Sequence, residues 1–164
     1  MTQTHHQNAD IDPRIERALT AFDAHDVDAM MAEFADGGTF TDPLVDGELS
    51  GDALRDYTLE VFEAFPDLRI DVRRVVSTGG EVVAIETTYV GTHEGPMEGL
   101  PPTGETIEIP GVTIIDVSDA GITAWRDYFD QQLFADQLGL TFPAIVTKVP
   151  KLATAKLRNA VEEL

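Results

Sequence analysis

Apolar side chains recur at helical spacing through the first third of the chain. Asp12-Pro13 offers a favourable cap and first position for a helix that carries an apolar stripe toward the core. A second, short helix is expected after Asp26 and should end at Gly37-Gly38, because glycine commonly terminates helices. A third helix should begin after Ser50 and close before Pro66, which cannot continue it.

The period of the pattern changes to two after residue 67, which indicates strands. Besides a short strand at 39–43, strands are expected at 68–73, 82–90, 106–117 and 122–129. Gly79-Gly80 and Asp119 to Gly121 mark turns, and Pro110-Gly111 should form a bulge or kink. A last helix should run from Asp130 to Leu138. Helices followed by long strands joined by hairpins predict one α+β domain, in which helices cover one face of a curved antiparallel sheet.

The chain of 164 residues is strongly acidic. Thirty Asp and Glu against eleven Lys and Arg give a formal net charge of −19. The carboxylates are scattered, and such a field repels nucleic acid and anionic membranes, which both require a basic footprint. Scattered carboxylate with almost no lysine is typical of proteins from salt-loving organisms, where molar salt screens the repulsion within about 3 Å; an ordinary acidic protein is the alternative. We therefore expect no nucleic-acid or membrane partner.

The two ends of the chain differ from the part between them. Residues 1–12 are polar and lack a basic start, so we expect a flexible tail and no secretory signal. Residues 13–140 should form the domain. The extension 141–164 holds all three lysines and apolar positions near helical spacing, so it should form a helix docked on the acidic body or on a partner subunit; contact with a membrane surface is the alternative. With no cysteine and no apolar run long enough for a membrane span, we expect a cytoplasmic protein.

An ordered set of short motifs resembles one family. Phe65-Pro66-Asp67-Leu68, Gly91 to Gly95, Gly99 to Gly104 and Gln137-Leu138-Gly139 occur in the order and approximate spacing of the SnoaL-like polyketide cyclases. The similarity covers residues 14–140. It implies the cone-shaped α+β fold of the nuclear transport factor 2-like superfamily (also called a cystatin-like roll), with an apolar pocket inside the cone.

The segment from Ile122 to Asp130 is similar to the end of limonene epoxide hydrolase, which has the same architecture. That resemblance implies that Trp125 and Asp127 face the pocket and that Asp127 acts in catalysis. Alternation along a strand puts Trp125, Asp127 and Phe129 on one face. Loss of hydration between two aromatic side chains would raise the pKa of Asp127, so it could donate a proton or hydrogen bond near neutrality. The alternative is a carboxylate that pairs with an arginine or caps local backbone.

The same resemblance suggests a second carboxylate. It places Glu86 at the position of a water-activating aspartate, but Ala84 stands where the family has the arginine that keeps this carboxylate ionised. Glu86 could still act as a base toward an acidic carbon, or it could be a solvated strand residue.

Further candidates complete the site. His93 could transfer protons near pH 7 or fix its glycine-rich turn by hydrogen bonds. Asp130 is a candidate both for the pocket wall and for a helix N-cap, and Tyr57 and Phe40 should line the pocket. No metal-ligand spacing, phosphate-cradling glycine loop or nucleophile motif occurs, so we expect no metal and no cofactor.

Three functions are compatible with the sequence. The first is cofactor-free acid/base chemistry, of cyclase or isomerase type, on a hydrophobic carbonyl compound. The second is hydrolysis of an epoxide, and the third is non-catalytic binding of a lipid-like molecule. We also expect a homodimer formed through the outer face of the sheet, where we place the apolar residues Val83, Ile85, Tyr89, Ile114 and Tyr128.

Overall fold

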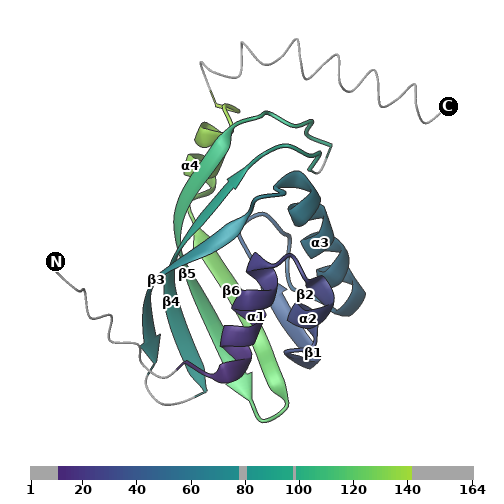
Figure 1. Ribbon diagram of the computed structural model, residues 1–164, viewed down its shortest axis with the longest axis vertical. Helices are drawn as coiled ribbons and strands as arrows, with labels where there is room; N and C mark the ends of the chain where they lie inside the picture. The colour runs from purple at the N-terminus through teal and green to yellow at the C-terminus, as the bar shows by residue number, and fades with distance from the viewer. Residues whose placement is uncertain (1–10, 78–80, 98, 142–164) are drawn as a thin grey trace.

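The structure, a computed structural model, describes residues 11–77, 81–97 and 99–141. Figure 1 shows a curved sheet with three of its helices gathered over one side and the fourth at one end. The helices are α1 (Pro13–Asp23), α2 (Val27–Met31), α3 (Gly51–Ala64) and α4 (Gln131–Gln137). The strands are β1 (Phe34–Thr41), β2 (Leu49–Ser50), β3 (Arg69–Ser77), β4 (Val82–Thr92), β5 (Thr106–Ser118) and β6 (Gly121–Phe129). These elements confirm the expected α+β class and most of the expected helices and strands.

The sheet is mixed rather than purely antiparallel. Its order is β2-β1-β6-β5-β4-β3, and β1 runs parallel to β6 while the other neighbours are antiparallel. The helix expected to end at Gly37-Gly38 ends at Met31 instead, and both glycines belong to β1. A Cβ on Gly38 would lie 2.5 Å from the carbonyl oxygen of Ile122. Glycine is therefore needed there for the close approach of β1 to β6, and not as a helix terminator.

The expected bulge at Pro110-Gly111 is absent from the β4–β5 ladder, where both residues pair in unbroken register. A Cβ on Gly111 would lie 2.9 Å from the Tyr128 carbonyl oxygen and from Cε2 of Tyr89. The glycine thus provides room where β6 and an inward tyrosine meet β5. The register shifts elsewhere: in β1 between Phe34 and Thr39, in β3 between Val72 and Arg74, and in β5 between Asp116 and Val117.

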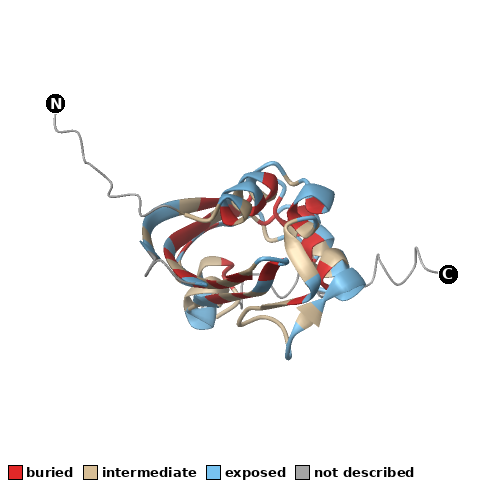
Figure 2. Cartoon of the chain, turned by 90° about the horizontal axis from the view of Figure 1, so that it is seen from below, coloured by how far each residue is buried: buried red, intermediate tan, exposed pale blue. Residues whose placement is uncertain are grey.

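The core lies between the concave face of the sheet and the helices, as the band of buried residues in Figure 2 shows. Val83, Ile85 and Tyr89 point into this core and are at most 9% exposed. Our assignment of these three residues to the outer face was therefore wrong. The outer face does carry Tyr128, which is 52% exposed. Exposed Val112 and Val82, paired with Tyr128 and Asp116 respectively, add further apolar area to it.

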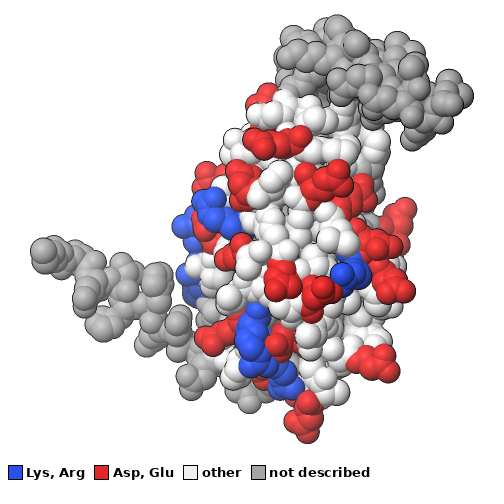
Figure 3. Space-filling model, turned by 45° about the vertical axis from the view of Figure 1, so that its right-hand side comes forward, with Lys and Arg blue, Asp and Glu red and all other residues white. Residues whose placement is uncertain are grey.

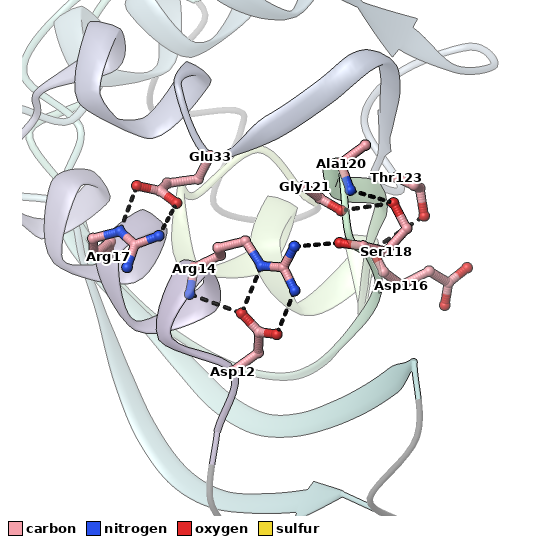
Figure 4. Close-up of polar contacts among 9 residues, drawn as sticks. All are labelled: Asp12, Arg14, Arg17, Glu33, Asp116, Ser118, Ala120, Gly121 and Thr123. Atoms are coloured by element: carbon pink, nitrogen blue, oxygen red, sulfur yellow. Dashed lines mark hydrogen bonds and ion pairs between the residues drawn. The ribbon is translucent and has the colours of Figure 1, made fainter.

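The start of α1 is fixed to the β5–β6 hairpin by an arginine (Figure 4). The Asp12 carboxylate caps the helix by accepting from the Arg14 backbone N–H at 2.9 Å, and it also binds the Arg14 guanidinium. That guanidinium donates to the carbonyl oxygen of Ser118 across the fold. Arg17 pairs with Glu33 nearby. The expected N-cap at Asp12 is confirmed. The hydrogen bonds from Arg14 lower the pKa of the Asp12 carboxyl to about 2.

Acidic side chains are spread over the surface drawn in Figure 3, with few basic ones among them. Within the described residues, no helix is long and apolar enough to cross a bilayer. The expected tail of residues 1–12 falls almost wholly outside the described residues. So do the Gly79-Gly80 turn and the docked helix expected within 141–164.

Candidate active site

A pocket of about 90 Å³ opens between the concave face of the sheet and the helices. Most of its described lining is aromatic or aliphatic. Trp125, Phe129, Tyr57 and Phe40, the four aromatic residues expected in its wall, all line it. The charged residues among the described lining are two carboxylates, from Asp127 and from a residue that sequence reasoning did not single out.

Asp127 is placed in this pocket by the alternation of β6. The strand buries Trp125 and Asp127 and exposes Tyr128, because successive side chains of a strand point to opposite faces. One carboxylate oxygen, Oδ1, accepts a hydrogen bond of 2.6 Å from the Thr113 hydroxyl and one of 2.9 Å from the Trp125 indole N–H. Asp127 itself is only 9% exposed. The carboxylate is thus fixed in orientation and almost removed from water.

Burial dominates the acidity of this carboxylate. Removing a charge from water raises the pKa of Asp127 from 3.8 to about 6, although the hydrogen bonds from Thr113 and Trp125 favour the ionised form. The negative charge of Asp42 raises the pKa further. Asp127 therefore changes its protonation state near neutral pH, as a group that gives and takes protons must.

A buried tyrosine continues the network. The Tyr89 hydroxyl lies 2.9 Å from the Thr113 hydroxyl, and Thr113 donates to Asp127. Thr113 has one proton, so this arrangement makes Tyr89 the donor to Thr113. Burial, and then the charge of Asp127, raises the pKa of Tyr89 above its usual value, so the phenol keeps its proton. Tyr89 and Thr113 thus form a chain of donors that ends on the carboxylate.

The second carboxylate of the pocket is that of Asp42, one residue beyond β1. Its Oδ2 accepts from the Tyr57 hydroxyl at 2.5 Å, and its Oδ1 accepts from the backbone N–H groups of Leu44 and Val45. These contacts hold the turn at Pro43 and the position of Tyr57. Asp42 therefore brings a second carboxylate to the pocket that Asp127 lines.

Comparison with known proteins places this geometry in a family. The model of the SnoaL-like polyketide cyclase family matches residues 14–138. The chain belongs to this family. No protein of curated function is significantly similar to it.

Solved structures show the same fold at low sequence identity. AclR, a proposed hydroxylase from Streptomyces galilaeus, is 20% identical with a TM-score of 0.68, and the match covers 79% of this chain and 95% of AclR. IdmH, a proposed polyketide cyclase from Streptomyces antibioticus, is 24% identical with a TM-score of 0.66 over 77% and 96% of the two chains. A protein with a ketosteroid isomerase-like fold from Catenulispora acidiphila, solved with trimethylamine, is 20% identical with a TM-score of 0.65 over 80% and 94%. These likenesses establish the fold.

Glu86 does not share the pocket with Asp127. In the sheet, Glu86 pairs with Val112 and Val112 with Tyr128, whereas Asp127 pairs with Thr113. Glu86 consequently lies on the outer face, where its side chain is 49% exposed and forms an ion pair of 3.0 Å with Arg74. The expectation that Glu86 and Asp127 form an acid/base pair is not met, because they lie on opposite faces.

His93 lies behind the pocket wall. It is fully buried, and its ring stacks on Phe65, a lining residue, with centroids 5.1 Å apart. The backbone N–H of Thr103 donates to its Nδ1 at 3.2 Å. These contacts hold the two ends of the 93–104 loop together. They favour the alternative in which His93 fixes its turn.

Asp130 lies outside the pocket. It is the N-cap of α4, accepting from the backbone N–H groups of Gln132 and Leu133, and it is exposed. Its expected place in the wall is therefore wrong, because the strand ends at Phe129 and the chain turns outward into the helix. Within the described residues, no three His, Asp or Glu side chains are grouped to hold a metal ion.

Sequence reasoning missed Asp42, Tyr89 and Thr113. Tyr89 and Thr113 could have been found by extending the inward face of Asp127 across the sheet, since Asp127 pairs with Thr113. The sequence carries no comparable signal for Asp42, because its hydrogen-bond partner Tyr57 lies 15 residues away on α3 and no local pattern links the two.

Proposed function

We propose that the protein is an enzyme that moves protons on a hydrophobic carbonyl compound without a cofactor, as a cyclase or isomerase does. The observation that supports this most is the buried carboxylate of Asp127, whose pKa lies near 6 inside an apolar pocket. A base of raised pKa abstracts a proton more strongly than an ordinary carboxylate does, and it returns the proton readily. Belonging to the SnoaL-like family agrees with this chemistry.

In the proposed reaction the ionised Asp127 takes a proton from the carbon next to the carbonyl group. The C–H bond breaks and its electron pair moves into the enolate. Since Oδ1 already accepts from Thr113 and Trp125, the proton is held on Oδ2. The neutral carboxylic acid then returns it, either to another carbon or to the alkoxide formed when the enolate closes a ring. Asp127 ends the cycle in its initial state.

The two other candidate functions have less support. Epoxide opening relied on Glu86 as the water-activating base, and Glu86 lies on the other face of the sheet. Ligand binding without chemistry fits the apolar lining, and the relative solved with trimethylamine binds a small organic molecule on this fold. A protein that only bound neutral lipid-like molecules, however, would gain nothing from burying an ionisable carboxylate with a pKa near neutrality.

The experiment is deuterium exchange at the α-carbon of phenylacetone, a small hydrophobic ketone, followed by NMR in heavy water. The wild-type protein should accelerate exchange over buffer, and Asp127→Asn, which keeps the shape of the side chain, should abolish the acceleration. Glu86→Gln is the matched control, because it removes a carboxylate from the same sheet on the outer face. Equal rates for wild type and Asp127→Asn would refute the assignment.

We also propose that the protein is a homodimer through the outer face of the sheet. The ion pairs Arg74–Glu86 and Arg126–Asp116 neutralise charges on this face, although the chain as a whole is strongly acidic. Tyr128 adds exposed apolar area to it. Light scattering should give twice the monomer mass of 17.9 kDa, and Tyr128→Glu should reduce it; a monomeric wild type at all concentrations would contradict this.

A further inference from the structure

We propose that the pocket selects small organic cations, in particular molecules that carry a quaternary or protonated tertiary ammonium group. This goes beyond the proposed function, because it concerns binding and holds whether or not Asp127 moves protons. Three features support it: the aromatic wall, the sign of the charges in the pocket, and the scarcity of polar groups that could serve any other kind of ion.

The wall is unusually rich in aromatic rings. Nine of its described lining residues are aromatic, among them Phe40, Tyr57, Tyr89, Trp125 and Phe129. Neighbouring rings stand with centroids 5.8 Å apart for Tyr89 and Phe129, and 5.9 Å apart for Phe40 and Tyr57. The faces of aromatic rings attract cations through their quadrupole, and several rings around one space are the usual setting for quaternary ammonium groups.

The charges in the pocket have one sign. Asp42 and Asp127 line it, and no Lys, Arg or His is among its described lining residues. The charge of Asp42 disfavours the ionised form of Asp127, so a cation placed in the pocket relieves the repulsion between the two carboxylates. An anionic ligand would instead meet two negative charges in a poorly hydrated space.

The chemistry of the wall also distinguishes an ammonium group from a metal ion. Calcium takes six to eight oxygen ligands, and magnesium requires a near-octahedral set. Here the carboxylate of Asp42 is occupied by Tyr57 and two backbone N–H groups, and Oδ1 of Asp127 by Thr113 and Trp125. A quaternary ammonium group needs no hydrogen bonds, so a ring of apolar side chains and a nearby carboxylate satisfy it.

Three probes of nearly equal shape and different charge test the inference. They are choline, its neutral carbon analogue 3,3-dimethylbutan-1-ol, and the anion 3,3-dimethylbutanoate. Trp125 is the single tryptophan of the chain and lines the pocket, so its fluorescence reports binding directly. At constant ionic strength and about pH 8, choline should bind at least about tenfold more tightly than the alcohol. The anion should bind more weakly than both.

The pH dependence gives a second readout that needs no variant. With a pKa of about 6, Asp127 is about one-tenth ionised at about pH 5, so the affinity for choline should fall roughly tenfold from about pH 8. The affinity for the alcohol should stay nearly constant. Asp127→Asn should bring choline close to the alcohol, and Glu86→Gln should leave both unchanged.

The inference is overturned if the alcohol or the anion binds as tightly as choline. It is equally overturned if choline does not bind at tens of millimolar, or if its affinity is independent of pH. Should Asp127→Asn fail to fold, the wild-type pH dependence decides alone. If the wild-type protein does not accelerate exchange at the α-carbon but still prefers choline, the proposed function is refuted and this inference stands.

Discussion

Replacing Asp127 by Asn should stabilise the folded protein at neutral pH and have little effect near pH 4. A carboxyl group whose folded pKa lies above its unfolded value binds its proton more tightly in the folded state. Its stabilising effect is complete below the unfolded pKa of 3.8 and is lost as the pH rises through the folded value of about 6. Ionised Asp127 is therefore a cost to folding at neutral pH.

The size of the effect follows from the shift in pKa. A difference of about two units between the folded and unfolded states corresponds to about 3 kcal/mol. Asn retains an oxygen that can accept from Thr113 and Trp125. Its NH₂ group, however, enters an apolar pocket, and the cost of this burial reduces the gain in folding free energy by about 1 kcal/mol. The net gain for Asp127→Asn should be about 2 kcal/mol at about pH 8.

Urea denaturation of both proteins at several pH values measures this effect. The stability difference between variant and wild type should grow by about 2 kcal/mol from about pH 4 to about pH 8. Glu86→Gln serves as control and should show little of this trend, because Glu86 is half-exposed on the outer face. A difference that does not change with pH would refute the reasoning, since it would mean that the pKa of Asp127 is equal in the two states.

Three further predictions concern the network, the surface and the extension. Thr113→Val removes the 2.6 Å hydrogen bond to Asp127, and an NMR titration should show the pKa of that carboxyl raised by about one to two units, because hydrogen bonds to charged groups contribute about 1.5–3 kcal/mol. The control is Thr58→Val, because Thr58 lines the same pocket but donates to the Leu54 carbonyl oxygen; it should leave the pKa of Asp127 unchanged. The melting temperature measured by circular dichroism should fall when molar salt is replaced by dilute buffer, because repulsion among thirty acidic residues returns; an unchanged value would mean that the acidity is incidental. Truncation after Leu140 should lower the melting temperature or the oligomeric mass, whereas an unaltered protein would show that the extension is not docked.

Local patterns predicted the helices and strands well, and the inward face of β6 in particular. In that strand the alternation is unambiguous, since Arg126 and Tyr128 occupy one face and Trp125 and Asp127 the other. Capping chemistry was equally informative at Asp12 and at the start of α4.

The faces of β4 were not predictable in the same way. Both of its faces carry apolar residues, Val82 and Ala84 on one and Val83 and Ile85 on the other, so the alternation gives no sign of which is inside. We assigned Val83 and Ile85 to the outer face, whereas they point into the core. The position of Tyr89 in the pocket follows only from its pairing with β5 and packing against Phe129.

Long-range pairing limited the prediction of the site itself. The parallel contact of β1 with β6 joins residues more than 80 positions apart, and it has no local signal. That contact is also what brings Asp42, just beyond β1, into the same pocket as Asp127. The second carboxylate was therefore sought on β4, where sequence similarity suggested Glu86, and not at the end of β1.

The most direct test of the central claim is an NMR titration of the Asp127 side-chain carboxyl carbon in the wild-type protein, with the resonance assigned by its loss in Asp127→Asn. The burial of this group among Trp125, Tyr89 and Thr113 predicts a midpoint of about 6. A midpoint at or below about 4, the range of an exposed aspartate, would contradict the account, because Asp127 would then be an ordinary carboxylate with no reason to carry protons near neutral pH.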